Sequence, residues 1–247
     1  MTALVWEGCL NVRDLGGLPT EDGRRTQTGA VVRADNIRKL TDAGWQSLAD
    51  HAVRRIVDLR WPEELVNDPP RDVDIEVVHV SVLGDAYDDE YVTRMDAHLR
   101  SVEDVVDHHS YAYIDWLERY RDDFGRAFAA IADADGTVVV HCMGGKDRTG
   151  AVAGLLLRLA GVGYDEIGED YAITAVNLEP STSKWIPAIE DEVERAKWEK
   201  LRHTPAEAMI RVVREVEARY GDVASYLRAA GLNNEQIERL RERLVAA

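Results

Sequence analysis

Runs of β-branched and aliphatic residues alternate with helical patterns along the first two thirds of the chain. We predict strands at residues 30–33, 53–59, 75–82 and 137–141. The last of these, Thr-Val-Val-Val-His, lacks polar alternation in its middle, which is typical of a strand buried on both faces of a parallel sheet. Strands separated by helices predict an α/β fold, with a mostly parallel central sheet flanked by helices.

Apolar residues at helical spacing predict the remaining elements. The expected helices are residues 41–51, one long amphipathic helix at 111–131, an apolar helix at 151–160, and most of the last third. Thr41 is the expected N-cap of the first helix. In the last third, Thr204 is expected to begin a capping box with Pro205 at N1, and Asn233 to open the final helix.

Turn-forming residues mark the loops between these elements. Asp22-Gly23 suits a hairpin turn, because both residues tolerate a positive φ. Three prolines within 62–70 predict a loop after the second strand. Residues 86–109 have a helical but polar pattern, typical either of a cover over a site or of a solvated helix. Since no linker-like stretch divides the chain, we expect one domain over residues 1–247.

Composition argues against several classes of protein. A formal charge of −16 over 247 residues argues against broad, nonspecific binding of DNA, RNA or anionic membranes, but it allows one positive pocket. No segment approaches the ~18 apolar residues of a membrane helix, and the N-terminus does not have the pattern of a signal peptide. Cys9 and Cys142 alone cannot form a disulfide framework. We expect a cytoplasmic protein without stable membrane insertion; export by a non-standard route would leave no trace in the sequence.

The strongest chemical signal is the segment His-Cys-Met-Gly-Gly-Lys-Asp-Arg-Thr-Gly at 141–150, which joins a predicted strand to an apolar helix. Backbone N–H groups that lead into a helix N-terminus neutralise a phosphate, and Gly144 and Gly145 let such a loop curl. The same field favours the reactive thiolate of Cys142. Arg148 offers a planar fork that matches two phosphate oxygens.

This arrangement predicts phosphate-ester hydrolysis through a phosphocysteine, with Cys142 as the nucleophile and Arg148 as the phosphate clamp. Thr149 is expected to donate a hydrogen bond to the sulfur. The expected phosphate-binding residues are Met143, Gly144, Gly145, Lys146 and Thr149. A cysteine six residues before an arginine is a weak signal alone, but its place between strand and helix makes it specific.

Hydrolysis also needs a general acid that protonates the leaving oxygen. Asp147, inside the loop, is the first candidate. Its alternative role is to pair with a neighbouring cation and shape the loop. Asp58 and Asp85 are further candidates for the acid.

The loop resembles the HCxxGKDRTG signature of the bacterial tyrosine phosphatase B-like family, also called atypical lipid phosphatases. Asn-Val-Arg-Asp-Leu-Gly-Gly at 11–17 is similar to the N-terminal NxRDLGG signature of that family. Further segments are similar to segments of that family and follow in the same order along the chain, at 31–35, 40–42, 57–60, 220–221 and 226–227. The resemblance covers most of the chain and is weakest between residues 87 and 109.

The resemblance implies the cysteine-phosphatase fold and hydrolysis of phosphotyrosine, often with phosphoserine, phosphothreonine or phosphoinositides. It assigns Cys142 as nucleophile, Arg148 as clamp and Asp147 as acid. Lys146 would favour substrates with extra negative charge, such as phosphoinositides, or else form an ion pair at the loop edge. The expected partners are a phosphorylated protein or phospholipid headgroup, with inorganic phosphate as product.

A second set of residues is expected to support the loop: His141, Asn11, Arg13, Asp14, Asp58 and Arg60. His141 is predicted to hydrogen-bond the loop backbone, not to act as a base, since adjacent strand residues point to opposite faces. The resemblance suggests that the three N-terminal residues lie near the loop; otherwise they brace the first turn. Arg33 and Arg60 stand at strand ends, where ligands commonly bind, or form surface ion pairs. Cys9 is either a redox partner of Cys142 or a small buried residue.

Other interpretations stay open at this point. Segment 61–63, Trp-Pro-Glu, superficially matches the acid-bearing WPD loop of conventional tyrosine phosphatases, and we interpret it as coincidence. Sulfurtransferases and arsenate reductases also use a loop cysteine, but the spacer before Arg148 suits phosphate better. A non-catalytic phosphate-binding module, or a phosphatase of a small soluble ester, are the remaining alternatives. No metal or cofactor is expected, since the chain has no HExxH or CxxC motif.

Overall fold

The computed structural model describes residues 2–84 and 88–245. Within this part of the chain, six strands form one sheet in the order β1-β2-β3-β6-β4-β5. They are β1 (Thr2–Ala3), β2 (Arg13–Asp14), β3 (Val31–Ala34), β4 (Val53–Asp58), β5 (Glu76–His79) and β6 (Thr137–His141). Strands β3, β6, β4 and β5 are parallel, and β1 and β2 are antiparallel at one edge. The predicted α/β fold with a mostly parallel sheet is confirmed.

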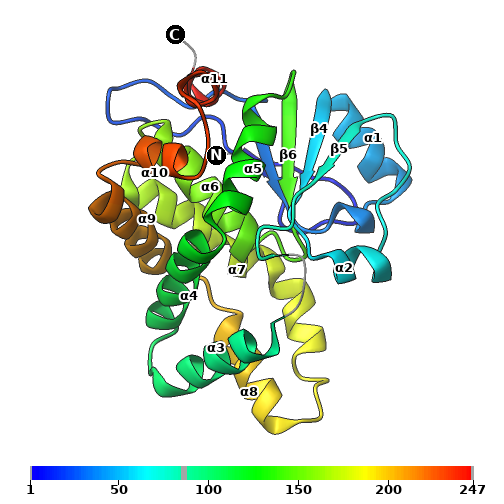
Figure 1. Cartoon of the computed structure of the whole chain (residues 1–247). Helices are drawn as coiled ribbons and strands as arrows, with labels where there is room; N and C mark the ends of the chain where they lie inside the picture. Colours follow the sequence, from blue (N-terminus) through cyan, green and yellow to red (C-terminus); the bar gives the residue numbers. More distant parts are fainter. Residues whose placement is uncertain (1, 85–87, 246–247) are drawn as a thin grey trace.

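Helices cover both faces of the sheet (Figure 1). They are η1 (Ile37–Lys39), α1 (Asp42–Asp50), α2 (Pro62–Asn67), α3 (Asp89–Ser101), α4 (Val105–Arg119), α5 (Arg121–Ala132), α6 (Asp147–Leu159), α7 (Tyr164–Trp185), α8 (Glu192–Leu201), α9 (Ala206–Tyr220), α10 (Val223–Ala229) and α11 (Asn234–Leu244). Because side chains alternate along a strand, Val32 and Val139 pack with Leu48 of α1, whereas Val31 and Val138 belong to the larger core with α5 and α6.

The single long helix predicted over 111–131 is wrong. The chain instead forms α4 and α5, which meet at Tyr120 with φ −112° and ψ 29°. The bend lets α4 pack on α9 while α5 packs on β4 and α11. Leu117 before the bend and Phe124 after it are both buried. The apolar pattern therefore runs through the bend and gives no sign of it.

Two predictions about prolines need correction. Pro62 does not lie in a loop but begins α2, because proline suits the first helical position, where its missing N–H would have had no partner anyway. The capping box predicted at Thr204 does not form. Pro205 is the N-cap of α9 and makes no side-chain bond. The Thr204 hydroxyl instead donates to the carbonyl of Ala172 and accepts from the N–H of Ala175 on α7.

Several element boundaries also differ from prediction. The run at 75–82 forms a strand only at Glu76–His79, on the sheet edge. Helix α6 begins at Asp147, four residues before its predicted start, so the end of the loop is already helical. The predicted turn is confirmed, with Gly23 at φ +86°. The N-cap at Thr41 and the final helix after Asn233 are confirmed too.

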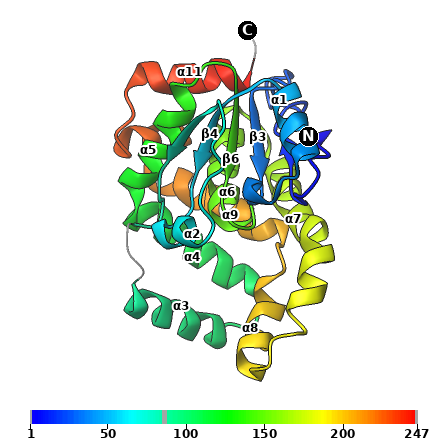
Figure 2. The same cartoon turned by 90° about the vertical axis from the view of Figure 1, so that its right-hand side faces the viewer.

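Helices α3 and α8 lie together at the end of the molecule below the sheet (Figures 1 and 2). The polar helical pattern predicted near residues 86–109 is thus present as α3, with Met95 and Leu99 as its buried residues. Residues 85–87, including the candidate acid Asp85, lie outside the described residues. No helix in the described part of the chain is both long and apolar enough to cross a membrane.

Candidate active site

The loop that follows β6 lies at the carboxyl ends of the parallel strands, where ligands bind in open α/β sheets (Figure 1). Cys142 directly follows β6 and is 2% exposed. Asp147 and Arg148 occupy the first turn of α6. Because the N–H groups of a first turn have no partner within the helix, the loop offers a positively polarised cradle around the sulfur.

The tight part of the loop is at Gly145. Its φ is +60°, and a Cβ there would lie 2.4 Å from the carbonyl oxygen of Ala34. Glycine is therefore required, both for the left-handed backbone and for the close approach of β3. At Gly144 φ is not positive, and a Cβ would meet nothing closer than 3.7 Å. Our expectation that both glycines are needed for the curl is wrong for Gly144.

Residues in and next to the N-terminal strands hold the loop backbone in place. The amide of Asn11 donates to the carbonyls of Gly144 and Gly145, each at 3.1 Å. Arg33 donates to the same Gly145 carbonyl at 2.6 Å, and the N–H of Asn36 donates to the Met143 carbonyl at 3.1 Å. These bonds occupy the loop carbonyls and leave its N–H groups to face a ligand.

Asp170 of α7 lies behind these contacts, and no sequence pattern singled it out. Its carboxylate pairs with Arg13 Nε at 2.7 Å and with Arg33 Nη1, and all three side chains are buried. Burial raises the pKa of Asp170, but the charges of Arg33 and Arg13 outweigh it and lower the pKa overall. Arg13 also donates to Asn11 at 2.5 Å. The network connects α7 to the loop.

Glu64 of α2 holds the guanidinium of Arg148. Its two oxygens accept from Nη1 at 2.5 Å and Nη2 at 3.0 Å, and the ring of Trp61 lies 5.3 Å from the guanidinium carbon. Among the described residues nothing bonds Nε, so that edge of the fork is available for a phosphate. The Trp-Pro-Glu segment was interpreted as coincidence, yet the helix it begins reaches the loop. The sequence missed Glu64 because Pro62 was assigned to a loop.

Asp147 is bound by two donors on one oxygen. The Tyr113 hydroxyl of α4 donates to Oδ1, and the Lys146 ammonium lies 2.9 Å from the same atom. Burial raises the pKa of Asp147, but Lys146, His109 and Tyr113 together outweigh it and lower the pKa to about 2. The ammonium of Lys146 also donates to the Leu201 carbonyl of α8 at 2.7 Å. Lys146 thus makes the loop-edge ion pair that was one of its two expected roles.

Two other supporting residues lie directly beneath the loop. His141 Nδ1 is 3.3 Å from the Cys142 carbonyl, and its Nε2 is 3.6 Å from Asp58. Burial lowers the pKa of His141 despite the nearby Asp58 carboxylate. Asp58 itself pairs with Arg60 at 2.7 Å. Since Asp58 is 1% exposed and already paired, it is poorly placed to act as the acid.

Four expectations are corrected by these contacts. Asp14 accepts from the N–H groups of Gly16 and Gly29, so it braces the first turn and not the active-site loop. Arg33 and Arg60 form buried ion pairs, not surface ones. The hydroxyl of Thr149 is buried without a hydrogen-bond partner among the described residues, so the bond expected to the sulfur is not made. 

The two cysteines are free thiols. Cys9 is partly buried and donates to the carbonyl of Asn36 at 3.5 Å. Burial, with the nearby Asp35, raises the pKa of Cys9 above its usual value, so it is held as a thiol. In residues 2–84 and 88–245 no group of three or more His, Cys, Asp or Glu side chains is arranged to hold a metal ion.

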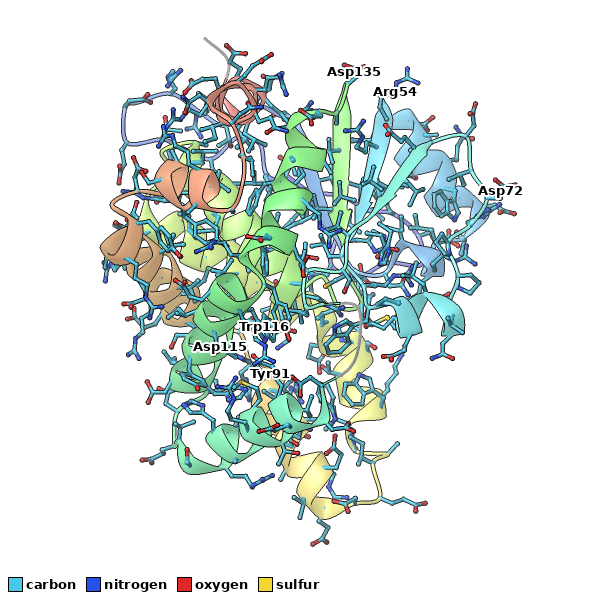
Figure 3. All side chains as sticks on the ribbon, in the orientation of Figure 1. Arg54, Asp72, Tyr91, Asp115, Trp116 and Asp135 are labelled. Carbon is cyan, nitrogen blue, oxygen red and sulfur yellow. The ribbon has the colours of Figure 1, made fainter. Side chains whose placement is uncertain are left out.

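A cavity of about 310 Å³ opens beside Asp147 and Lys146, between α3, α4 and α8. Its wall is mainly apolar and aromatic, with Met95 and Trp198 among its residues. Figure 3 shows Tyr91 of α3 next to Trp116 of α4 at this place. A group attached to a phosphate in the loop would enter this space, so the cavity can receive an apolar substituent.

Comparisons with known proteins agree with this geometry. A family model described as the tyrosine phosphatase family matches residues 4–246. A tyrosine-protein phosphatase of Nostoc commune is 32% identical over 232 residues, which cover 87% of this chain and 74% of the relative. The triple specificity protein phosphatase PtpB of Mycobacterium tuberculosis is 23% identical over 268 residues, with 95% of this chain and 96% of the relative covered.

Proposed function

Because the chain belongs to the tyrosine phosphatase family, we propose that it hydrolyses phosphotyrosine through a phosphocysteine intermediate on Cys142. The observation that carries this proposal is the position of Cys142. Its sulfur is at the start of a glycine-containing loop, at the N-terminus of α6, with the guanidinium of Arg148 held beside it by Glu64. A phosphate dianion and a thiolate repel each other, so they approach only where positive groups such as these surround them.

The first step transfers the phosphoryl group to the enzyme. The phosphate binds the loop N–H groups and the Nε edge of Arg148, and the Cys142 thiolate attacks phosphorus. The phosphorus–oxygen bond to the substrate breaks, and the leaving oxygen takes a proton from Asp147. At rest Asp147 is ionised, with a pKa of about 2. The negative charge of a bound phosphate raises that pKa and favours the protonated acid.

The second step returns the enzyme to its starting state. Water attacks the phosphorus of the phosphocysteine while the Asp147 carboxylate takes its proton. The phosphorus–sulfur bond breaks, and inorganic phosphate and the Cys142 thiolate are released. Both steps use only side chains of this chain and water, so no cofactor is needed for the proposed reaction.

The substrate range is part of the proposal. The aromatic wall of the cavity beside Asp147 supports aryl phosphates such as phosphotyrosine. One relative is named a triple specificity phosphatase, which supports including phosphoserine and phosphothreonine. Phosphoinositides would depend on Lys146, whose ammonium already contacts Asp147 and Leu201. We therefore place phosphotyrosine first and phosphoinositides second.

Phosphate release by the wild type and Cys142→Ser tests the proposal, with a phosphotyrosine peptide and a phosphoinositide assayed side by side. We expect the variant to lose turnover on both substrates and to keep its affinity for inorganic phosphate, because the loop N–H groups and Arg148 remain. Release from the peptide alone would define a protein tyrosine phosphatase, and release from both a dual-substrate enzyme. A Cys142→Ser variant that keeps substantial activity would rule out the phosphocysteine.

A further inference from the structure

Two buried tyrosine hydroxyls form a row that ends on Asp147. Tyr171 of α7 has its hydroxyl 2.7 Å from that of Tyr113 on α4, and Tyr113 is hydrogen-bonded to Asp147 Oδ1. Both tyrosines are only 1% exposed. Buried hydroxyls need hydrogen-bond partners, and these two find them in each other and in the carboxylate of the loop.

The direction of these hydrogen bonds is fixed by the charge of Asp147. An ionised carboxylate only accepts, so Tyr113 must donate to it. The Tyr113 oxygen then accepts the proton of Tyr171. Burial raises the pKa of both tyrosines well above the usual value, which keeps both protonated. The row therefore runs from Tyr171 to Tyr113 to Asp147.

The ring of Tyr113 is fixed by its neighbours on the same helix. It stacks with His109 at 5.5 Å and with Trp116 at 5.0 Å between ring centroids. These residues are four before and three after Tyr113, which places them on the same side of α4. His109 is itself held, with a ring nitrogen 2.9 Å from the carbonyl of His203.

The ring of Tyr171 is fixed against the helix that carries the loop. It lies over Gly150, where a Cβ would sit 3.2 Å and 3.3 Å from two of its ring carbons. A side chain at Gly150 would thus push Tyr171 away. Gly150, the last glycine of the loop motif, therefore leaves room for the ring of Tyr171, whose hydroxyl hydrogen-bonds to Tyr113.

The two oxygens of Asp147 are therefore not equivalent. Oδ1 has Tyr113 and Lys146, whereas no described residue makes a hydrogen bond to Oδ2. The Asp147 side chain is 33% exposed and borders the cavity that would receive the leaving group. Oδ2 is thus the oxygen free to carry a proton to that group.

We propose that Tyr113, supported by Tyr171, is the residue that positions the general acid: its hydroxyl holds Oδ1 so that Oδ2 faces the leaving oxygen of the bound ester. This rests on the proposed function, in which Asp147 is the acid. Tyr113 takes no proton in this scheme. It acts only through the orientation of the Asp147 carboxylate.

Leaving-group dependence tests this role in Tyr113→Phe, Asp147→Asn and the double variant. The substrates are 4-nitrophenyl phosphate, an activated ester, and phenyl phosphate, whose poor leaving group needs an acid. General acids contribute about 10²–10⁴-fold. We expect Tyr113→Phe to lower kcat/KM on phenyl phosphate about tenfold and to change kcat/KM on the activated ester little. This ratio reports the transfer of the phosphoryl group to Cys142 and not the later hydrolysis, in which Asp147 acts as the base. In the Asp147→Asn background, Tyr113→Phe should cost nothing more.

Tyr226→Phe is the matched control. Its hydroxyl is also buried, but it donates to the carbonyl of Leu117, at 3.0 Å, and not to Asp147, so both esters should keep their rates. If Tyr113→Phe fails to fold, as judged by circular dichroism, Tyr171→Phe should show the same selective loss to a smaller extent. Equal loss on both esters, or a further loss on top of Asp147→Asn, would overturn the inference. Full activity of Cys142→Ser would instead overturn the proposed function.

Discussion

Glu64 determines which edge of the Arg148 guanidinium is free. Burial alone raises the pKa of Glu64, but the hydrogen bond and charge of Arg148 outweigh it and lower the pKa overall, so the carboxylate is charged. We expect Glu64→Gln to lower kcat/KM about tenfold, because an amide offers one acceptor where the guanidinium now has two. Steady-state kinetics on a phosphotyrosine peptide measures this effect.

Glu63→Gln on the same helix is the control for that variant. Glu63 is exposed, and no described residue of the loop forms a hydrogen bond or ion pair with it, so its loss of charge should leave kcat/KM within twofold of the wild type. If both variants lower kcat/KM equally, the negative charge of α2 supports activity, and the hydrogen bonds between Glu64 and Arg148 do not.

Individual residues of the loop were predictable because their chemistry depends on local spacing. Cys142, Asp147 and Arg148 stand in a contiguous segment, and strand–loop–helix context brings them together. Their partners come from distant segments that share no spacing with them. Asp170 and Tyr113 belong to ordinary amphipathic helices, and nothing in those helices distinguishes them from surface or core residues before the fold is known.

Polar contacts attach helix α3 to α8, beside the buried side chains of Met95 and Leu99. Lys197 of α8 pairs with Asp96 at 3.0 Å, and Lys200 donates to the carbonyls of Leu99 and Val102 at the end of α3. Exposed and partly exposed ionic contacts contribute little, about 0–1 kcal/mol each. The element that covers the cavity is therefore held more weakly than the helices on the sheet.

Lys200→Met should loosen α3 without unfolding the protein. The variant keeps the aliphatic stem and removes the donor to the helix end, so amide hydrogen exchange in residues 89–101 should become faster. Exchange in α5 and α6 should not change, and the free energy of unfolding should fall by less than about 1 kcal/mol. Lys184→Met, at an exposed position of α7, is the control. Unchanged exchange in α3 would show that its apolar contacts alone hold it.

Elements were predictable where the pattern of apolar residues is regular and a cap or glycine marks an end. β6 and α1 met both conditions. The break between α4 and α5 was missed because it follows from which partner each helix packs on, and the apolar pattern continues across it. Helix α2 was missed because a proline can either end a helix or begin one. Here Pro62 begins the helix, since it directly follows the N-cap residue Trp61.

At the scale of the whole molecule, one buried carboxylate, Asp170, is the counter-ion that two buried arginines share. Replacing Asp170 by Asn leaves Arg13 and Arg33 without a counter-ion, and breaking such buried pairs costs about 3–5 kcal/mol. We expect Asp170→Asn to lower the free energy of unfolding by this amount at pH 7, measured by urea denaturation. Thr174→Val, which removes only a neutral acceptor from Arg13, should cost much less.

The same pair predicts how stability depends on pH. The pKa of Asp170 is lower in the folded protein than its usual value, because of Arg33 and Arg13 and in spite of burial. Its contribution is therefore complete above the unfolded pKa of about 3.9 and is lost as the pH falls through the folded pKa. The difference in unfolding free energy between the wild type and Asp170→Asn should narrow in that acidic range. A difference that stays constant down to pH 2 would contradict this account.

The sequence separation between Asp170 and its two arginines affects when, during synthesis of the chain, the active site can fold. It lies 157 residues after Arg13 and 137 after Arg33. A nascent chain that has left the ribosome only as far as Cys142 holds two arginines whose counter-ion does not yet exist, and burying them costs several kcal/mol. The phosphate cradle can close only once α7 has been synthesised and docked. The enzyme therefore becomes active only when most of the polypeptide has been synthesised, so incomplete chains are expected to be inactive.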